Sequence, residues 1–89
     1  SFNPENSFKE KYSVCFRFDS GKQIAATIRN STLEISKNIQ SCNLNVSTSE
    51  KILKETLAGL RSPVAMVASG AINVEGSKVD FLKFLTSFK

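Results

Sequence analysis

Histidine and tryptophan are both absent from the 89-residue sequence, and the lack of histidine restricts its chemistry most. Histidine is the commonest general base and zinc ligand, and it activates the nucleophile in Ser-His and Cys-His enzymes. The eight carboxylates are each isolated in the sequence, so a paired acid and base would need a coincidence of tertiary structure. The four glycines lack the spacing of a phosphate-binding loop. We therefore expect no catalytic residue, no metal site and no cofactor in this chain alone.

Long hydrophobic runs are missing as well, since no apolar stretch approaches the roughly 20 residues that span a bilayer. The length fits one domain. Residues 1–10 are mostly polar and show no clear period, so we interpret them as a tail or linker and assign the domain to residues 11–89. Because the sequence begins at Ser1 without methionine, we expect an excised piece of a longer protein or a processed product.

Positive charge is present but dispersed. The net charge is +4, and the twelve basic residues occur in ones and twos without a polybasic block. Nucleic-acid binding usually shows a clustered basic patch, so this pattern does not support it. A mild basic excess is compatible with attraction to anionic amphiphiles, although its commonest meaning is a solvated surface.

The two cysteines, Cys15 and Cys42, lack the spacing of a metal clip. In alternating strands Cys15 is in phase with polar Arg17, whereas Cys42 is in phase with apolar Leu44, which places them on opposite faces of a sheet. We therefore expect two free thiols and no Cys15–Cys42 disulfide. Two unpaired cysteines slightly favour a cytoplasmic location, which the sequence otherwise leaves unknown.

Alternation of apolar and polar residues predicts four antiparallel strands before any helix, at 12–18, 24–28, 33–35 and 42–46. A capping box at Ser47 and Glu50 then begins an amphipathic helix that Gly59 ends. Further along, Ser62 followed by proline begins a short helix that ends at Gly70.

A fifth strand at 71–75 and a final helix after Gly76 complete the order of elements. Ser77 is the expected N-cap of that helix, with Asp80 three residues on. The fold class is therefore α+β, with a five-stranded, mostly antiparallel sheet and helices packed on one face.

The final helix carries an unusually wide apolar stripe. Its apolar residues cover roughly 160°, where an ordinary surface helix needs about 100°. One interpretation is ordinary core, and the other is a surface that serves an apolar ligand, a partner or a membrane. On the second interpretation, truncating Phe84 or Phe88 would weaken ligand binding and leave stability almost unchanged.

Three segments of the C-terminal half carry a family resemblance: Leu57-Ala58-Gly59-Leu60, Ser62-Pro63, and the G-x-I-x-V-x-G pattern from Gly70 to Gly76. Together with the order of elements, they make the chain resemble the sterol carrier protein type 2 family, most closely the C-terminal domain of alkyl sulfatases. The resemblance implies a non-catalytic module that binds a lipid, fatty acid or alkyl chain. Metal-dependent sulfatase chemistry would belong to another domain of the parent protein.

We accordingly place the ligand in a groove between the helices and the sheet. The predicted lining residues are Leu57, Leu60, Met66, Phe81, Phe84, Leu85 and Phe88. The expected partners are an alkyl-chain amphiphile and a catalytic domain in cis or a second copy of the chain. The alternative is a protein-interaction or oligomerisation module that uses the same apolar groove.

Overall fold

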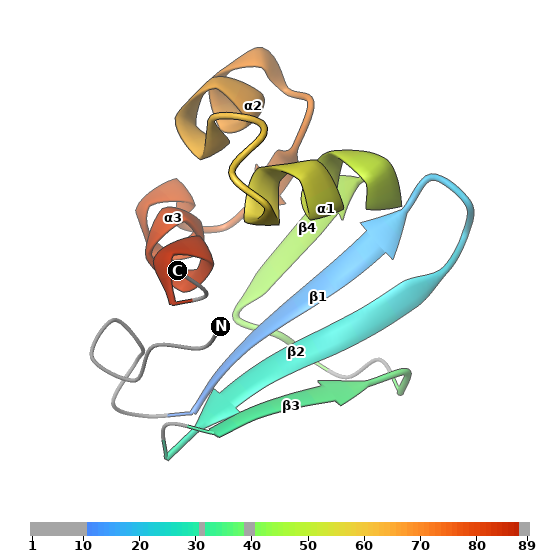
Figure 1. Cartoon of the computed structure of the whole chain (residues 1–89). Helices are drawn as coiled ribbons and strands as arrows, with labels where there is room; N and C mark the ends of the chain where they lie inside the picture. The colour runs from blue at the N-terminus through green and yellow to red at the C-terminus, as the bar shows by residue number, and fades with distance from the viewer. Residues whose placement is uncertain (1–10, 31, 39–40, 88–89) are drawn as a thin grey trace.

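A computed structural model describes residues 11–30, 32–38 and 41–87, and within them the elements follow the predicted order (Figure 1). The predicted tail at residues 1–10 and Phe88 lie outside the described residues. The strands are β1 (Tyr12–Phe18), β2 (Gln23–Arg29), β3 (Thr32–Ser36), β4 (Leu44–Thr48) and β5 (Asn73–Glu75). The helices are α1 (Glu50–Leu57), α2 (Pro63–Ser69) and α3 (Lys78–Thr86).

The five strands form one sheet in the order β3-β2-β1-β4-β5. Three neighbouring pairs are antiparallel, and β1 pairs with β4 in parallel, with Val14 opposite Leu44. The prediction of a mostly antiparallel sheet is confirmed, but the expectation that the first four strands are all antiparallel is wrong for β4. Alternation assigns the faces of a strand but not its direction, and β4 joins the free side of β1 rather than β3.

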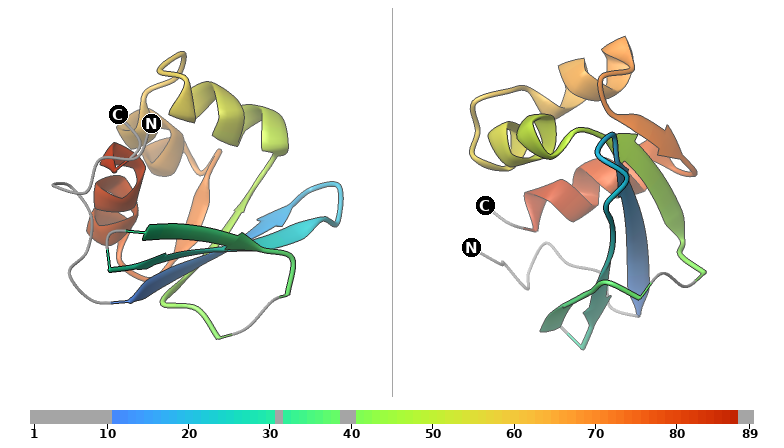
Figure 2. Two further views of the ribbon diagram at one scale, coloured as in Figure 1. Left: turned by 60° about the horizontal axis from the view of Figure 1, so that its bottom comes forward. Right: turned by 90° about the vertical axis from the view of Figure 1, so that its right-hand side faces the viewer.

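The helices lie on one side of the sheet, as predicted, with α1 and α3 against the strands and α2 farther out (Figure 2). Apolar residues of β1, β2, β4 and β5 point toward them and form the core with Leu53 of α1. In α3 the residues Phe81, Phe84 and Leu85 are buried in this core. Most of the wide stripe of α3 is therefore covered by the domain itself.

Local capping sets where the helices begin and end. Ser62 and Ser77 cap α2 and α3, and Gly59 and Gly70 take positive φ angles of 81° and 83° just after their helices, all as predicted. The predicted cap at Ser47 is wrong. β4 continues through Thr48, and the Ser49 hydroxyl accepts the Ile52 amide instead, at 3.0 Å.

The cysteines contradict the prediction of free thiols, because Cys15 and Cys42 form a disulfide with a Cα–Cα distance of 5.7 Å. The phase argument fails because β4 begins only at Leu44, so the strand does not fix the direction of the Cys42 side chain. Asn43 holds the same segment to β1. Its backbone N–H donates to the Ser13 carbonyl at 2.9 Å, and its side-chain Oδ1 accepts the Ser13 backbone N–H at 2.8 Å. The argument for a cytoplasmic location from unpaired cysteines therefore loses its basis.

Candidate apolar groove

A groove lined only by apolar side chains opens between α1, α3 and the outer strands β2 and β3. It encloses about 110 Å³. Its lining, which we call the apolar groove, consists of Phe16, Ile24, Ala26, Ile35, Leu53, Leu57, Phe84 and Leu85. The helices cover the middle of the sheet but leave the helix-side face of the edge strand β3 open, and the groove lies at this boundary (Figure 1).

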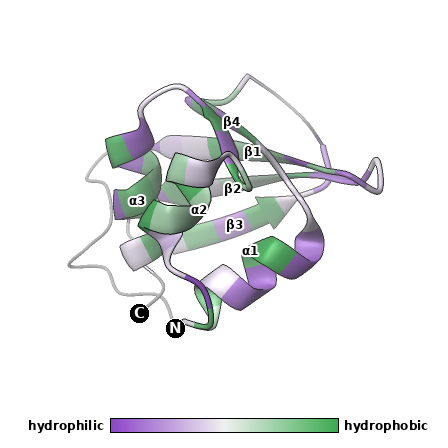
Figure 3. Cartoon of the chain, turned by 90° about the horizontal axis from the view of Figure 1, so that it is seen from above, coloured by the Kyte–Doolittle hydropathy of each residue, from purple (hydrophilic) through white to green (hydrophobic). Residues whose placement is uncertain are grey.

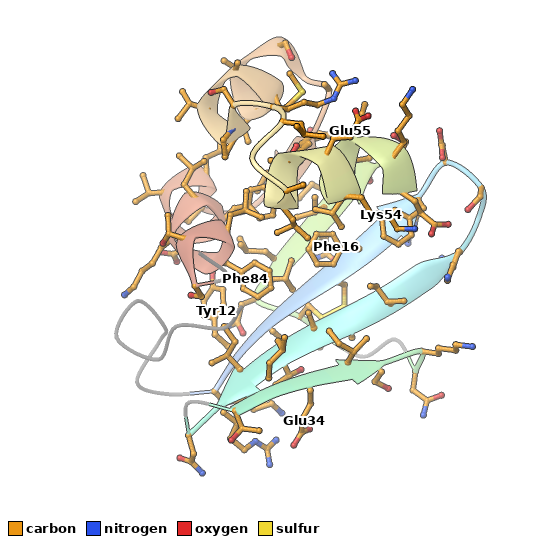
Figure 4. The ribbon with its side chains drawn as sticks, viewed as in Figure 1. Tyr12, Phe16, Glu34, Lys54, Glu55 and Phe84 are labelled. Atoms are coloured by element: carbon orange, nitrogen blue, oxygen red, sulfur yellow. A yellow bond between two sulfur atoms is a disulfide. The ribbon has the colours of Figure 1, made fainter. Side chains whose placement is uncertain are left out.

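The groove has an exposed mouth and a buried floor. Ile35 on β3 is 59% exposed and Leu57 at the end of α1 is 42% exposed, so both stand at the opening. Phe84 on α3 is only 2% exposed and forms the floor. Its ring centroid lies 6.2 Å from that of Phe16 on β1, with the two ring planes tilted by 46° (Figure 4). An apolar chain entering between Ile35 and Leu57 would therefore end against aromatic rings.

The structure brings three of the predicted ligand-binding residues together in this groove, namely Leu57, Phe84 and Leu85. Phe81 of α3 is fully buried, and Met66 of α2 is partly buried against the core. Leu60 is 76% exposed on the connection between α1 and α2. Neither Phe81, Met66 nor Leu60 lines the groove.

Sequence reasoning missed the contribution of the first half of the chain. Ile24 and Ala26 on β2 and Ile35 on β3 provide one wall, whereas the predicted lining came entirely from the C-terminal half. The available signal was the alternation in β3, because Ile35 lies opposite Ala26 on the helix side of the strand that ends the sheet among the described residues. An apolar residue on the inner face of an edge strand is a candidate for a groove rather than for the core.

A second hollow, of about 250 Å³, continues the apolar groove toward the start of α1. It shares Ile24 and Leu53 with the groove and adds Phe18, Lys22, Glu50 and Lys54, and we call it the charged end. α1 supplies both apolar and charged side chains to this hollow, because hydrophobic and hydrophilic residues alternate around the helix (Figure 3). The apolar groove thus opens at one end onto charged groups.

Three polar contacts hold the helices that frame the groove. The Arg61 side chain donates from Nε to Glu55 Oε1 at 2.7 Å, and its Nη1 lies 3.9 Å from Met66 Sδ, which fixes the turn between α1 and α2. At the other end the Tyr12 hydroxyl donates to Asp80 Oδ2 at 3.0 Å and ties β1 to α3. Burial, reinforced by this bond and by the charge of Asp80, raises the pKa of Tyr12 to about 12.

The chemistry of these side chains favours binding over reaction. The apolar groove contains no nucleophile and no acid or base. Across the described ranges 11–30, 32–38 and 41–87, no three side chains of the metal-ligating types gather into a site. Within the same ranges, none of the helices is both long enough and apolar enough to cross a membrane.

Comparison with known proteins agrees with this description. The sequence matches the family described as alkyl sulfatase C-terminal over residues 1–89. Its fold is similar to that of the stereoselective inverting sec-alkylsulfatase Pisa1 from Pseudomonas sp., with a TM-score of 0.85 and 15% identity. That match covers 97% of this chain and only 14% of the other, so the chain spans a small part of the length of that protein. No curated protein matches the sequence significantly.

Sterol carrier proteins share the same fold. A structure described as UbiJ-SCP2 ubiquinone synthesis protein has a TM-score of 0.77 at 10% identity, with 96% of this chain and 73% of the other covered. Apo sterol carrier protein 2 from Yarrowia lipolytica has a TM-score of 0.60 at 12% identity, with 88% and 66% covered. The chain belongs to the alkyl sulfatase C-terminal family and has a sterol carrier protein-like α+β fold.

Proposed function

We propose that this domain binds the hydrocarbon chain of an amphiphile in the apolar groove. The observation that carries the proposal is the composition of the lining, which is apolar at every position while the mouth stays open at Ile35 and Leu57. Each methylene moved from water into such a lining contributes about 0.8 kcal/mol. Burial of a few methylenes is therefore enough for a weak, reversible complex.

The size of the groove restricts the ligand. Its volume of about 110 Å³ is small compared with the roughly 300–1,000 Å³ of pockets that enclose a drug-sized molecule. A single alkyl chain can enter part-way, whereas a rigid polycyclic sterol needs far more room. We therefore infer a single-chain amphiphile as the ligand, with part of its chain or its head group left in solvent.

The family supports a role beside a catalytic domain. The domain corresponds to a small part of the alkylsulfatase Pisa1, and that protein is an enzyme. In a parent protein of this kind, a module that captures alkyl chains would raise the local concentration of substrate near the catalytic domain. We infer this recruiting role for the domain, with the chemistry carried out elsewhere in the parent.

A protein-interaction role is the second candidate, and one observation favours it. Leu60 and Val64 are exposed but do not line the groove, so the domain has apolar surface that a single chain in the groove would not cover. A second copy or a neighbouring domain could bury this larger surface. If this role is the main one, purified protein should associate and should carry no bound fatty acid.

The test is a titration of the domain with a fluorescent medium-chain fatty acid. Ile35→Thr keeps a β-branched residue on β3 but removes apolar surface from the mouth, so it should weaken binding about fivefold, roughly 1 kcal/mol. Val79→Thr is the matched control, because Val79 is an exposed apolar residue of α3 that lies outside the groove. Equal affinity of the two variants, or no binding by the parent domain, would rule out the apolar groove as the ligand site.

A further inference from the structure

The charged end of the groove contains more unopposed positive than negative charge. Lys22, Glu50 and Lys54 meet there around Phe18, Ile24 and Leu53. The neighbouring acid on α1, Glu55, forms an ion pair with Arg61 at 2.7 Å rather than with Lys54. Within the described part of the chain, Lys54 has no ion pair.

The contact between Lys22 and Glu50 is weak. Lys22 Nζ lies 3.8 Å from Glu50 Oε2, and the side chains are 55% and 35% exposed. Exposed pairs of this kind contribute about 0–1 kcal/mol, so an incoming anion can compete with Glu50 for Lys22. Both ammonium groups are therefore available to a ligand at the edge of an apolar surface.

We propose that Lys54 and Lys22 form an anion subsite for the head group of the ligand, with Glu50 as its competitor. The inference rests on the proposed function, because it uses the apolar groove as the site of the alkyl chain. Ile24 and Leu53 belong to both hollows, so the groove and the subsite form one continuous surface. A single-chain amphiphile then lies with its tail against Phe84 and its anionic head group at Lys54. Both residues are labelled in Figure 4.

The geometry selects ligands by charge. A sulfate or carboxylate attached to the chain meets two ammonium groups as soon as the tail occupies the groove. For an alcohol of the same length, only the burial of its tail contributes to the binding free energy. An alkylammonium is repelled by the lysines. The ligand class is therefore an anionic amphiphile, and the order of affinity should be anion, then alcohol, then cation.

The first experiment measures binding of octyl sulfate, octanoate, octanol and octylammonium to the domain by calorimetry, below the concentrations at which they form micelles. We expect both anions to bind about three- to tenfold more tightly than octanol, and octylammonium to bind most weakly. Raising the salt concentration should reduce the advantage of the anions and leave octanol unchanged. Comparison of sulfate with carboxylate shows which head group the subsite prefers.

The second experiment assigns the effect to residues. Lys54→Gln should lower the affinity for octyl sulfate about three- to fivefold and leave the affinity for octanol unchanged. Lys51→Gln is the matched control, because it removes the same charge from α1 at an exposed position outside both hollows. Glu50→Gln frees Lys22 and should strengthen octyl sulfate binding by about two- to threefold.

The outcomes separate the two proposals. If the parent domain binds none of the four ligands, the proposed function fails and the subsite fails with it. If octanol binds as tightly as octyl sulfate and Lys54→Gln changes neither, the apolar groove stands and the anion subsite is overturned. If Lys51→Gln lowers the affinity for octyl sulfate as much as Lys54→Gln does, the effect is one of net charge, and the assignment to Lys54 and Lys22 is overturned.

Discussion

The two faces of the sheet are buried by different means. On the helix side, large apolar residues such as Phe16, Ile28 and Phe81 fill the space under α1 and α3. On the other side the buried residues are small, and among them the Ser13 and Thr27 hydroxyls lie 3.2 Å apart in a hydrogen bond. The disulfide fastens the segment before β4 over this second face (Figure 2).

This difference explains why the groove lies where it does. A layer of helices packs as rigid rods, and rods leave an opening wherever the sheet extends beyond them, as it does at β3. The other face also has a hollow, of about 260 Å³, but polar and charged residues such as Arg17, Asn45 and Glu75 line it. The helix side therefore offers a place for an alkyl chain, while the other side contributes mainly stability.

The largest expected effect is on the helix side. Phe84→Ala removes a buried ring that contacts Phe16, and such truncations cost about 3–5 kcal/mol. Sequence reasoning led to the opposite expectation, that Phe84 faces a ligand and that its loss leaves stability unchanged. A urea melt decides between them, with Val79→Ala on the exposed side of α3 as the control. A Phe84→Ala midpoint equal to that of Val79→Ala would show that the floor of the groove is not core.

The next effect tests the opposite face. The disulfide joins residues separated by 27 positions, and the chain-entropy model gives about 3.5 kcal/mol for closing a loop of this length. Addition of a reductant should therefore lower the urea midpoint of the parent domain, while a Cys15→Ser, Cys42→Ser variant should be insensitive to reductant.

Ligand binding should depend on the helix side of the sheet and not on the side that carries the disulfide. Because the apolar groove lies on the helix side, the affinity for an alkyl chain should be nearly the same before and after reduction under conditions where the domain stays folded. Thiol titration of the untreated, denatured domain should find no free thiol. Two titrating thiols would restore the original expectation and remove the covalent tie from the second face.

Local signals in the sequence were sufficient for most of the fold. Alternation placed Val14, Phe16 and Phe18 on the buried face of β1, and serine caps with glycine stops located α2 and α3. These features depend on residues a few positions apart, so one segment contains all the necessary information. The family resemblance, carried by such segments, was confirmed for the same reason.

Apart from the cap that was placed at Ser47 instead of Ser49, the features that were missed depend on distant segments. The direction of β4 follows from its partner β1, some 30 residues earlier, and no pattern within β4 encodes it. The disulfide depends on Cys42 and Asn43 lying outside the strand, which begins only at Leu44 and so leaves the Cys42 side chain able to turn to the other face. The wall of the groove at Ile35 likewise depends on where the helices stop, which requires the packed structure.

The smallest expected effect concerns Tyr12, whose hydroxyl makes a polar contact with Asp80 on the helix side of the sheet. Burial and the bond to Asp80 raise its pKa to about 12, from the ordinary value of 10.0. The folded state therefore favours the protonated hydroxyl. Its contribution to stability is complete below pH 10 and is lost as the pH rises toward 12.

Tyr12 is the single tyrosine of a chain without tryptophan, so its phenolate absorbance can be followed directly. We expect a midpoint near pH 12 in the parent domain and a lower midpoint in Asp80→Asn, which removes the charge that opposes ionisation. Tyr12→Phe removes one part-buried hydrogen bond and should cost about 0.5–1.5 kcal/mol at neutral pH. That difference between parent and variant should shrink between pH 10 and 12, since only the parent has a hydroxyl to ionise. A midpoint near 10 in the parent would mean that β1 and α3 are not joined at this point, and that apolar packing alone holds α3 against the sheet.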